Sequence, residues 1–123
     1  MQNDNVKFRI EFNKRLINFS LAVIRLCNEI RKDRNLWAVA DQLIRSATSI
    51  GANIIEARAS SSKLDYLKFF QISLKSANET QYWLILTKES CPSLRAQADK
   101  ILSECEEISK IIGAGVLTMK GKR

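Results

Sequence analysis

The sequence predicts an all-α protein folded as an antiparallel, up-down-up-down four-helix bundle. Four long stretches each carry apolar residues at alternating steps of three and four, which is the spacing of one buried helix face. Only 4 glycines and 1 proline occur among 123 residues, too few for a chain built from many turns and strands. We therefore expect one domain over residues 1–119, with helices at about 7–32, 37–59, 63–88 and 93–117, and a loose basic tail at 120–123.

The first helix has two contrasting faces. Its apolar face is formed by Phe12, Leu16, Phe19, Val23, Leu26 and Ile30. On the other side Lys14, Arg25 and Lys32 follow one another at helical spacing, so this face is basic and directed to solvent. Such a face is either an ordinary solvated surface or a contact for a polyanion.

The second helix is rich in small residues. Its inner face is formed by Leu43, Ala47, Ile50, Ile54 and Ala57. A second flank contains Ile44, Gly51 and Ile55, and between residues 42 and 55 only Arg45 is charged. A helix that is apolar or small on most of its circumference is normally covered on most of it. We therefore expect Ile44, Gly51 and Ile55 to contact another subunit.

A polar stripe runs beside the inner face of the second helix. It contains Ser46, Ser49, Asn53, Glu56 and Ser60. Because charge is sparse around it, we expect the stripe to be partly buried, where its side chains need hydrogen-bond partners. We interpret Ser49, Asn53 and Glu56 as a structural polar network, and ligand contact is the alternative.

Cap signals separate the remaining helices. Asp33 or Asn35 can cap the second helix, and Ser62 with Asp65 has the form of a capping box before the third. The third helix places small residues between aromatic ends on one flank, which lets a neighbouring helix approach closely there. Pro92 suits the first turn of the fourth helix, whose apolar face is formed by Leu94, Ala98, Ile101, Cys105, Ile108 and Ile112.

Composition argues against several kinds of site. The chain has no histidine, which removes the usual general base near neutral pH and most catalytic zinc ligand sets. Cys27, Cys91 and Cys105 are odd in number and lack CxxC spacing, so we expect reduced, structural thiols. We predict no enzyme activity, no metal and no cofactor. The charged start and the lack of a long apolar stretch predict a cytoplasmic protein without a membrane span.

The second and third helices also carry a family resemblance. The motif comprises Gln42-Leu43, Arg45, Ser49-Ile50, Asn53-Ile54, Glu56, a serine-rich turn, Lys68-Phe69-Phe70, Ser73, Ser76 and Glu79. This pattern resembles the four-helix-bundle family of 23S rRNA intervening-sequence proteins, relatives of the accessory variability determinants of diversity-generating retroelements. The resemblance implies a basic homopentamer and, through the retroelement relatives, binding of RNA and of a reverse transcriptase.

The charge distribution supports a polyanionic partner. The net charge is +7, and residues 1–90 carry 14 Lys and Arg against 9 Asp and Glu, whereas residues 91–117 are slightly acidic. Aromatic residues are too few for a base-stacking platform, so we expect contacts to phosphates or to RNA shape. The expected nucleic-acid contacts are Lys14, Arg25, Lys32, Arg58, Lys63, Lys120, Lys122 and Arg123. The alternative function is a scaffold whose basic face binds an acidic protein such as a reverse transcriptase.

Overall fold

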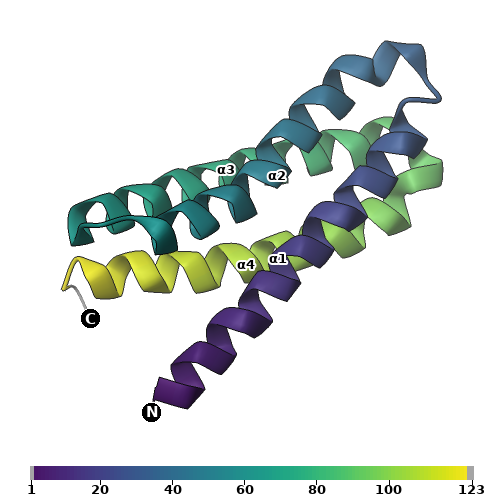
Figure 1. Cartoon of the computed structure of the whole chain (residues 1–123). Coiled ribbons are helices and arrows are strands. Elements are labelled where there is room, and N and C mark those ends of the chain that lie inside the picture. Colours follow the sequence, from purple (N-terminus) through teal and green to yellow (C-terminus); the bar gives the residue numbers. More distant parts are fainter. Residues whose placement is uncertain (1, 122–123) are drawn as a thin grey trace.

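The computed structural model confirms the predicted all-α four-helix bundle (Figure 1). It describes residues 2–121, with side chains from residue 5 onward. Over this range four α-helices are joined by short turns, two of which contain a 3-10 helix. The elements are α1 (Gln2–Ile30), η1 (Arg34–Leu36), α2 (Trp37–Ala59), α3 (Lys63–Ser90), η2 (Pro92–Leu94) and α4 (Arg95–Met119).

3-10 turns precede α2 and α4, and they change the cap predicted for α2 and the start predicted for α4. The Asp33 carboxylate accepts a hydrogen bond from the Asn35 N–H at 3.0 Å, so it caps η1, and α2 begins without a side-chain cap. Pro92 opens η2, and α4 therefore starts at Arg95, two residues later than expected. Both turns tighten the chain between antiparallel helices.

Ser62 caps α3, which is one half of the predicted capping box. The Ser62 hydroxyl accepts a hydrogen bond from the Asp65 N–H at 3.0 Å. The Asp65 carboxylate also lies in the first turn, where the helix dipole favours negative charge. These two residues fix where the third helix begins.

The inner faces of the four helices meet in one core. Every residue of the apolar faces predicted for the first two helices is buried, and five of the six predicted for the fourth are buried as well. The largest side chains with no more than 1% exposure include Leu26, Leu43, Ile50, Leu84 and Ile108. Each contributes about 1.5–3 kcal/mol by leaving water. This core accounts for the order of the bundle without any cofactor.

Small residues bring α2 and α3 close together. Ser73 and Thr80 of α3 are fully buried against α2. The Ser73 hydroxyl donates to the Ile50 carbonyl at 2.8 Å, and the Thr80 hydroxyl donates to the Ser46 hydroxyl at 2.9 Å. The small residues of α2 thus allow close helix packing within the chain. A small hydroxyl side chain takes little space in this contact and still forms a hydrogen bond with the facing helix.

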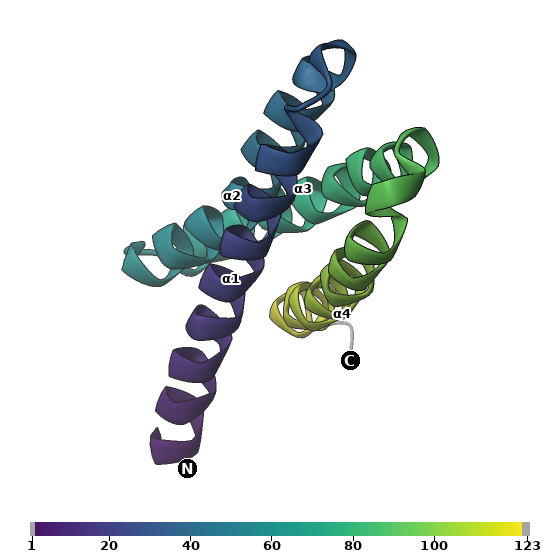
Figure 2. The same cartoon turned by 90° about the vertical axis from the view of Figure 1, so that its right-hand side faces the viewer.

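The bundle is not closed evenly on all sides. Helix α2 packs along α3, and α3 along α4, but α1 contacts α4 over a much shorter stretch than it contacts α2. The two views show α1 leaning across α2 while its amino-terminal half diverges from α4 (Figures 1 and 2). The short contact between α1 and α4 leaves a groove between residues 11–25 of α1 and 97–107 of α4.

Two cysteines are sealed inside the core. The thiols of Cys27 and Cys105 approach the carbonyls of Ala40 and Ala77, each at 3.5 Å. Burial raises the pKa of Cys27 to about 11 and that of Cys105 to about 12. Cys91 is only half-buried, although burial raises its pKa as well. The expectation of structural thiols therefore fits the positions of Cys27 and Cys105.

We predict that one thiol per chain reacts with Ellman's reagent in the folded protein at pH 8. The thiolate is the reactive form, and a raised pKa keeps the two buried thiols protonated until the pH approaches about 11. Cys91→Ser should abolish the reaction in native buffer, and denaturant should then reveal the remaining two thiols. Rapid reaction of Cys27 or Cys105 in native protein would contradict the described packing.

Candidate nucleic-acid interface

The basic side chains expected on the first helix do lie on its exposed face. Lys14 and Arg25 are solvent-exposed on α1, and neither forms an ion pair among the described residues. Lys32 follows the end of α1, and its ammonium group lies 2.9 Å from the Glu29 carboxylate. Lys14 and Arg25 are therefore the more available cations for a polyanion.

The remaining predicted contacts are spread over the bundle. Arg58 is half-buried, because its guanidinium donates to the Asn13 side-chain oxygen of α1 at 2.7 Å. Its Nε is buried and has no partner among the described residues. Lys63 opens α3 and Lys120 follows α4, both exposed, whereas Lys122 and Arg123 lie outside the described residues. Arg58 thus acts as a link between α2 and α1 more than as a free surface charge.

A groove of about 860 Å³ separates α1 from α4. Its walls carry Lys14, Asn18 and Arg25 from α1 and Gln97, Lys100, Ser103, Glu104 and Glu107 from α4, with Glu11 near one end. Phe19 and Ala22 of α1 and Ile101 of α4 form its apolar part. The two best-exposed cations of α1 therefore face a shared space with α4.

One ion pair bridges this groove. The Arg15 guanidinium donates to both carboxylate oxygens of Glu104, at 2.6 and 2.8 Å. These hydrogen bonds raise the pKa of Arg15, which is charged at any physiological pH. The planar guanidinium of Arg15 forms two parallel hydrogen bonds with the Glu104 carboxylate. This bidentate ion pair connects the two helices and neutralises the charge of Glu104.

The charges left in the groove are mostly positive. Glu104 is neutralised by Arg15, and Glu107 lies 3.5 Å from the Lys110 ammonium group. Taken together, the lining carries four cations and three carboxylates, so positive charge exceeds negative charge by one: Lys14, Arg15, Arg25 and Lys100 against Glu11, Glu104 and Glu107. Sequence analysis did not single out Lys100, because it belongs to a segment that is acidic on average. Only the approach of α4 to α1 places it beside the basic face.

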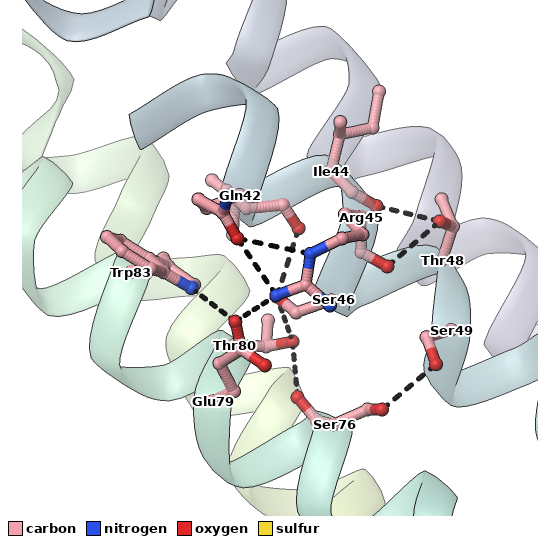
Figure 3. Close-up of polar contacts among 11 residues, drawn as sticks. Gln42, Ile44, Arg45, Ser46, Thr48, Ser49, Ser76, Glu79, Thr80 and Trp83 are labelled. Carbon is pink, nitrogen blue, oxygen red and sulfur yellow. Dashed lines mark hydrogen bonds and ion pairs between the residues drawn. The ribbon is translucent and has the colours of Figure 1, made fainter. Parts of the chain in front are cut away.

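The polar stripe of α2 forms a seam with α3. Arg45 is ion-paired to Glu79, and the Trp83 indole donates to the same carboxylate at 3.0 Å (Figure 3). One turn further along, the hydroxyls of Ser49 and Ser76 lie 2.9 Å apart (Figure 3). These contacts join facing sides of the two helices, so the seam has a structural role.

Two of the three predicted network residues belong to this seam. The Asn53 amide donates to the Ser49 carbonyl at 2.8 Å and to the Ser49 hydroxyl at 2.9 Å. Glu56 is exposed, and it has no hydrogen bond or ion pair among the described residues. The structure thus joins Ser49 and Asn53 but places Glu56 outside the cluster. Of the three, only Ser49 bonds to α3, and Asn53 joins the seam through Ser49.

An apolar face remains open between α1 and α2. Ile17 is 57% exposed and Ile55 is 48% exposed, and with Leu21, Gly51 and other residues they line a shallow cavity of about 240 Å³. A side chain at Gly51 would meet the Leu16 Cβ at 3.4 Å, so this glycine permits close packing of α1 on α2. Ile44 is half-buried and lies outside the cavity lining.

Comparison with known proteins agrees with this architecture. The family described as 23S rRNA-intervening sequence protein matches residues 9–114. The chain belongs to this family. Its solved relatives include a protein of unknown function from the S23 ribosomal protein family of Bacteroides thetaiotaomicron VPI-5482. That protein shares 32% sequence identity and a TM-score of 0.79, over 85% of this chain and 96% of its own. A search of curated proteins finds no match.

The family resemblance can now be placed on the structure. Its residues on α2 and α3, among them Arg45, Ser49, Ser76 and Glu79, form the seam between these helices. For this member of the 23S rRNA-intervening sequence protein family, the motif therefore specifies helix packing. The basic face and the groove lie elsewhere, on α1 and α4.

Two negative findings apply to the described part of the chain. Within residues 2–121 no group of three or more His, Cys, Asp or Glu residues is arranged to hold a metal ion. In the same range no helix is both long enough and apolar enough to cross a membrane. Neither finding changes the assignment of α1 and α4 as the candidate interface.

We predict that Asn53→Ala destabilises the fold more than Glu56→Gln does. Loss of the two Asn53 hydrogen bonds should cost about 1 kcal/mol and lower Tm by roughly 3–6 °C. Removing the charge of exposed Glu56 should change stability by less than about 0.5 kcal/mol. Thermal unfolding followed by circular dichroism, at one protein concentration, measures both. Equal destabilisation by the two substitutions would show that Glu56 has a partner in solution.

Proposed function

We propose that the protein is a non-enzymatic, self-associating RNA-binding protein that contacts phosphates through the basic face of α1. The observation that carries this proposal is the placement of Lys14, Arg25 and Lys100 around an open groove in which cations outnumber carboxylates. Lysine and arginine bind phosphates at any sequence, so the contact positions RNA without reading its bases.

The spacing of the cations favours a polymer over a small anion. Lys14 and Arg25 are 11 residues apart on one helix, a rise of about 16 Å at 1.5 Å per residue. A single phosphate group cannot touch both side chains, whereas a phosphodiester chain can. The family description refers to an intervening sequence of 23S rRNA, and this supports RNA as the polyanion.

Self-association fits the apolar face between α1 and α2. Ile17, Leu21 and Ile55 present adjoining apolar surface that a second copy of the chain would remove from water. The predicted interface residues Gly51 and Ile55 lie in this face, and the family resemblance suggests a homopentamer. Repetition of the basic face in every subunit would strengthen binding to a long RNA beyond the affinity of one chain.

We predict that Ile55→Glu breaks the oligomer. A carboxylate placed in an apolar contact must lose its hydration without a partner, which disfavours association. Multi-angle light scattering at micromolar concentration should show smaller species, while Ile85→Glu, at an exposed position on α3, should keep the wild-type mass. A wild-type protein that is a stable monomer under these conditions would remove the self-association from the proposal.

We predict that Lys14→Gln with Arg25→Gln weakens RNA binding and flattens its salt dependence. If each side chain neutralises one phosphate, the slope of log K against log salt should fall by about 1.4–1.8 units. The matched control is Lys68→Gln with Lys75→Gln, which removes two exposed charges from α3. Fluorescence anisotropy over a salt series measures both variants.

Two results would count against RNA binding through α1. Equal loss in the α1 and α3 double variants would show that only total charge matters. Absence of any RNA binding by the wild type at low salt would reject the proposal, and selective binding of an acidic protein would then favour the scaffold function.

A further inference from the structure

We propose that the groove between α1 and α4 holds a single strand of RNA, with Lys100 of α4 binding phosphates opposite Lys14 and Arg25 of α1. This inference rests on the proposed function and adds to it the form of RNA and the helix that completes the contact. It follows from the two walls of the groove, its apolar part and the bridge that spans it.

The first argument is that cations stand on both walls. Lys14 and Arg25 belong to α1, whereas Lys100 reaches the groove from α4. A flat surface for duplex RNA would need its cations on one outward-facing plane. Cations on facing walls suit a chain that lies between them, with phosphates in reach of either side.

The second argument is the apolar part of the groove. Phe19 is 3% exposed and Ile101 is 6% exposed, and half-buried Ala22 lies between the walls with them. Phe19 and Ile101 are thus core side chains that close the bottom of the groove, and Ala22 is its accessible apolar residue. An unpaired base of a single strand has an apolar face that can lie against Ala22, whereas an A-form duplex presents its sugar–phosphate backbone there.

Polar groups beside the apolar surface fit unpaired bases as well. Asn18, Gln97 and Ser103 line the groove and are exposed, so their amides and hydroxyl can bond base edges or ribose hydroxyls. The only aromatic ring in the lining is that of Phe19, which is nearly covered. Stacking is therefore weak, and we expect little selectivity among single strands of different sequence.

The ion pair between Arg15 and Glu104 keeps the groove available. Its two hydrogen bonds, at 2.6 and 2.8 Å, link α1 to α4, and both side chains belong to the lining of the groove. Both are about one-third exposed, so the link is weak enough to adjust when a strand enters. The bridge connects the walls, and Lys14, Arg25 and Lys100 supply the attraction.

The first test compares forms of RNA. A fluorescent 12-nucleotide oligouridylate and a 12-base-pair RNA duplex are titrated with wild type, Lys100→Gln and Lys75→Gln at about 0.1 M salt. We expect the wild type to prefer the single strand. Lys100→Gln should weaken single-strand binding roughly fivefold, with a smaller effect from the α3 control Lys75→Gln.

The second test changes shape without changing charge. Ala22→Leu inserts a larger apolar side chain into the groove, and Ala96→Leu makes the same change at an exposed position of α4 outside the lining. We expect Ala22→Leu to weaken single-strand binding at least about threefold and to leave any duplex binding unchanged, because phosphate contacts alone do not need the apolar surface. Circular dichroism verifies that the variants are folded. If Ala22→Leu does not fold, the single-strand affinity of Lys100→Gln decides the test.

The outcomes separate this inference from the proposed function. Equal affinity for duplex and single strand, with no effect of Ala22→Leu or Lys100→Gln, would overturn the groove while leaving phosphate binding by α1 intact. No binding of either RNA by the wild type at low salt would overturn both. An oligothymidylate of the same length, bound equally well, would still support the groove and would show that the ribose hydroxyl is not used.

Discussion

The close packing of α2 against α3 is the contact on which the rest of the molecule depends. Ser46, Ser73 and Thr80 are buried there, and each hydroxyl reaches an oxygen acceptor, so polar groups occupy a tight helix contact without loss of hydrogen bonds. Because α2 and α3 form the central pair, α1 packs mainly on α2 and α4 mainly on α3. The first and last helices then meet only briefly, and the groove follows from this arrangement.

Two functions are proposed for one helix. The inner face of α1 belongs to the core, one flank continues into the apolar surface around Ile17 and Ile55, and the other carries Lys14 and Arg25 into the groove. A subunit contact through the apolar flank would hold α1 from one side while RNA contacts it from the other. Residues 5–11 of α1 are all exposed in the single chain, so this end of the helix would gain from such a contact.

Helical periodicity was sufficient to predict the fold class, the buried faces and the cap at Ser62, because these depend on residues close together in sequence. It could not predict which side chains of different helices lie near one another, because this depends on how the helices cross. Glu56 shares the spacing of Asn53 but is exposed and has no partner among the described residues, and Arg58 donates to Asn13 of α1. Lys100 was hidden by the acidic average of its segment, and only the crossing of α1 over α4 brings it beside Arg25.

The bridge from Arg15 to Glu104 makes the geometry of the groove sensitive to the surrounding electrolyte. A pair this exposed contributes about 1 kcal/mol or less and is screened by dissolved ions. Apolar packing, which salt does not screen, holds all four helices in the core, so ionic strength affects only the contact that α1 makes with α4 through this ion pair. If the groove holds a strand of RNA, salt would act twice at this place: it would compete for the phosphates, and it would weaken the link between the two walls.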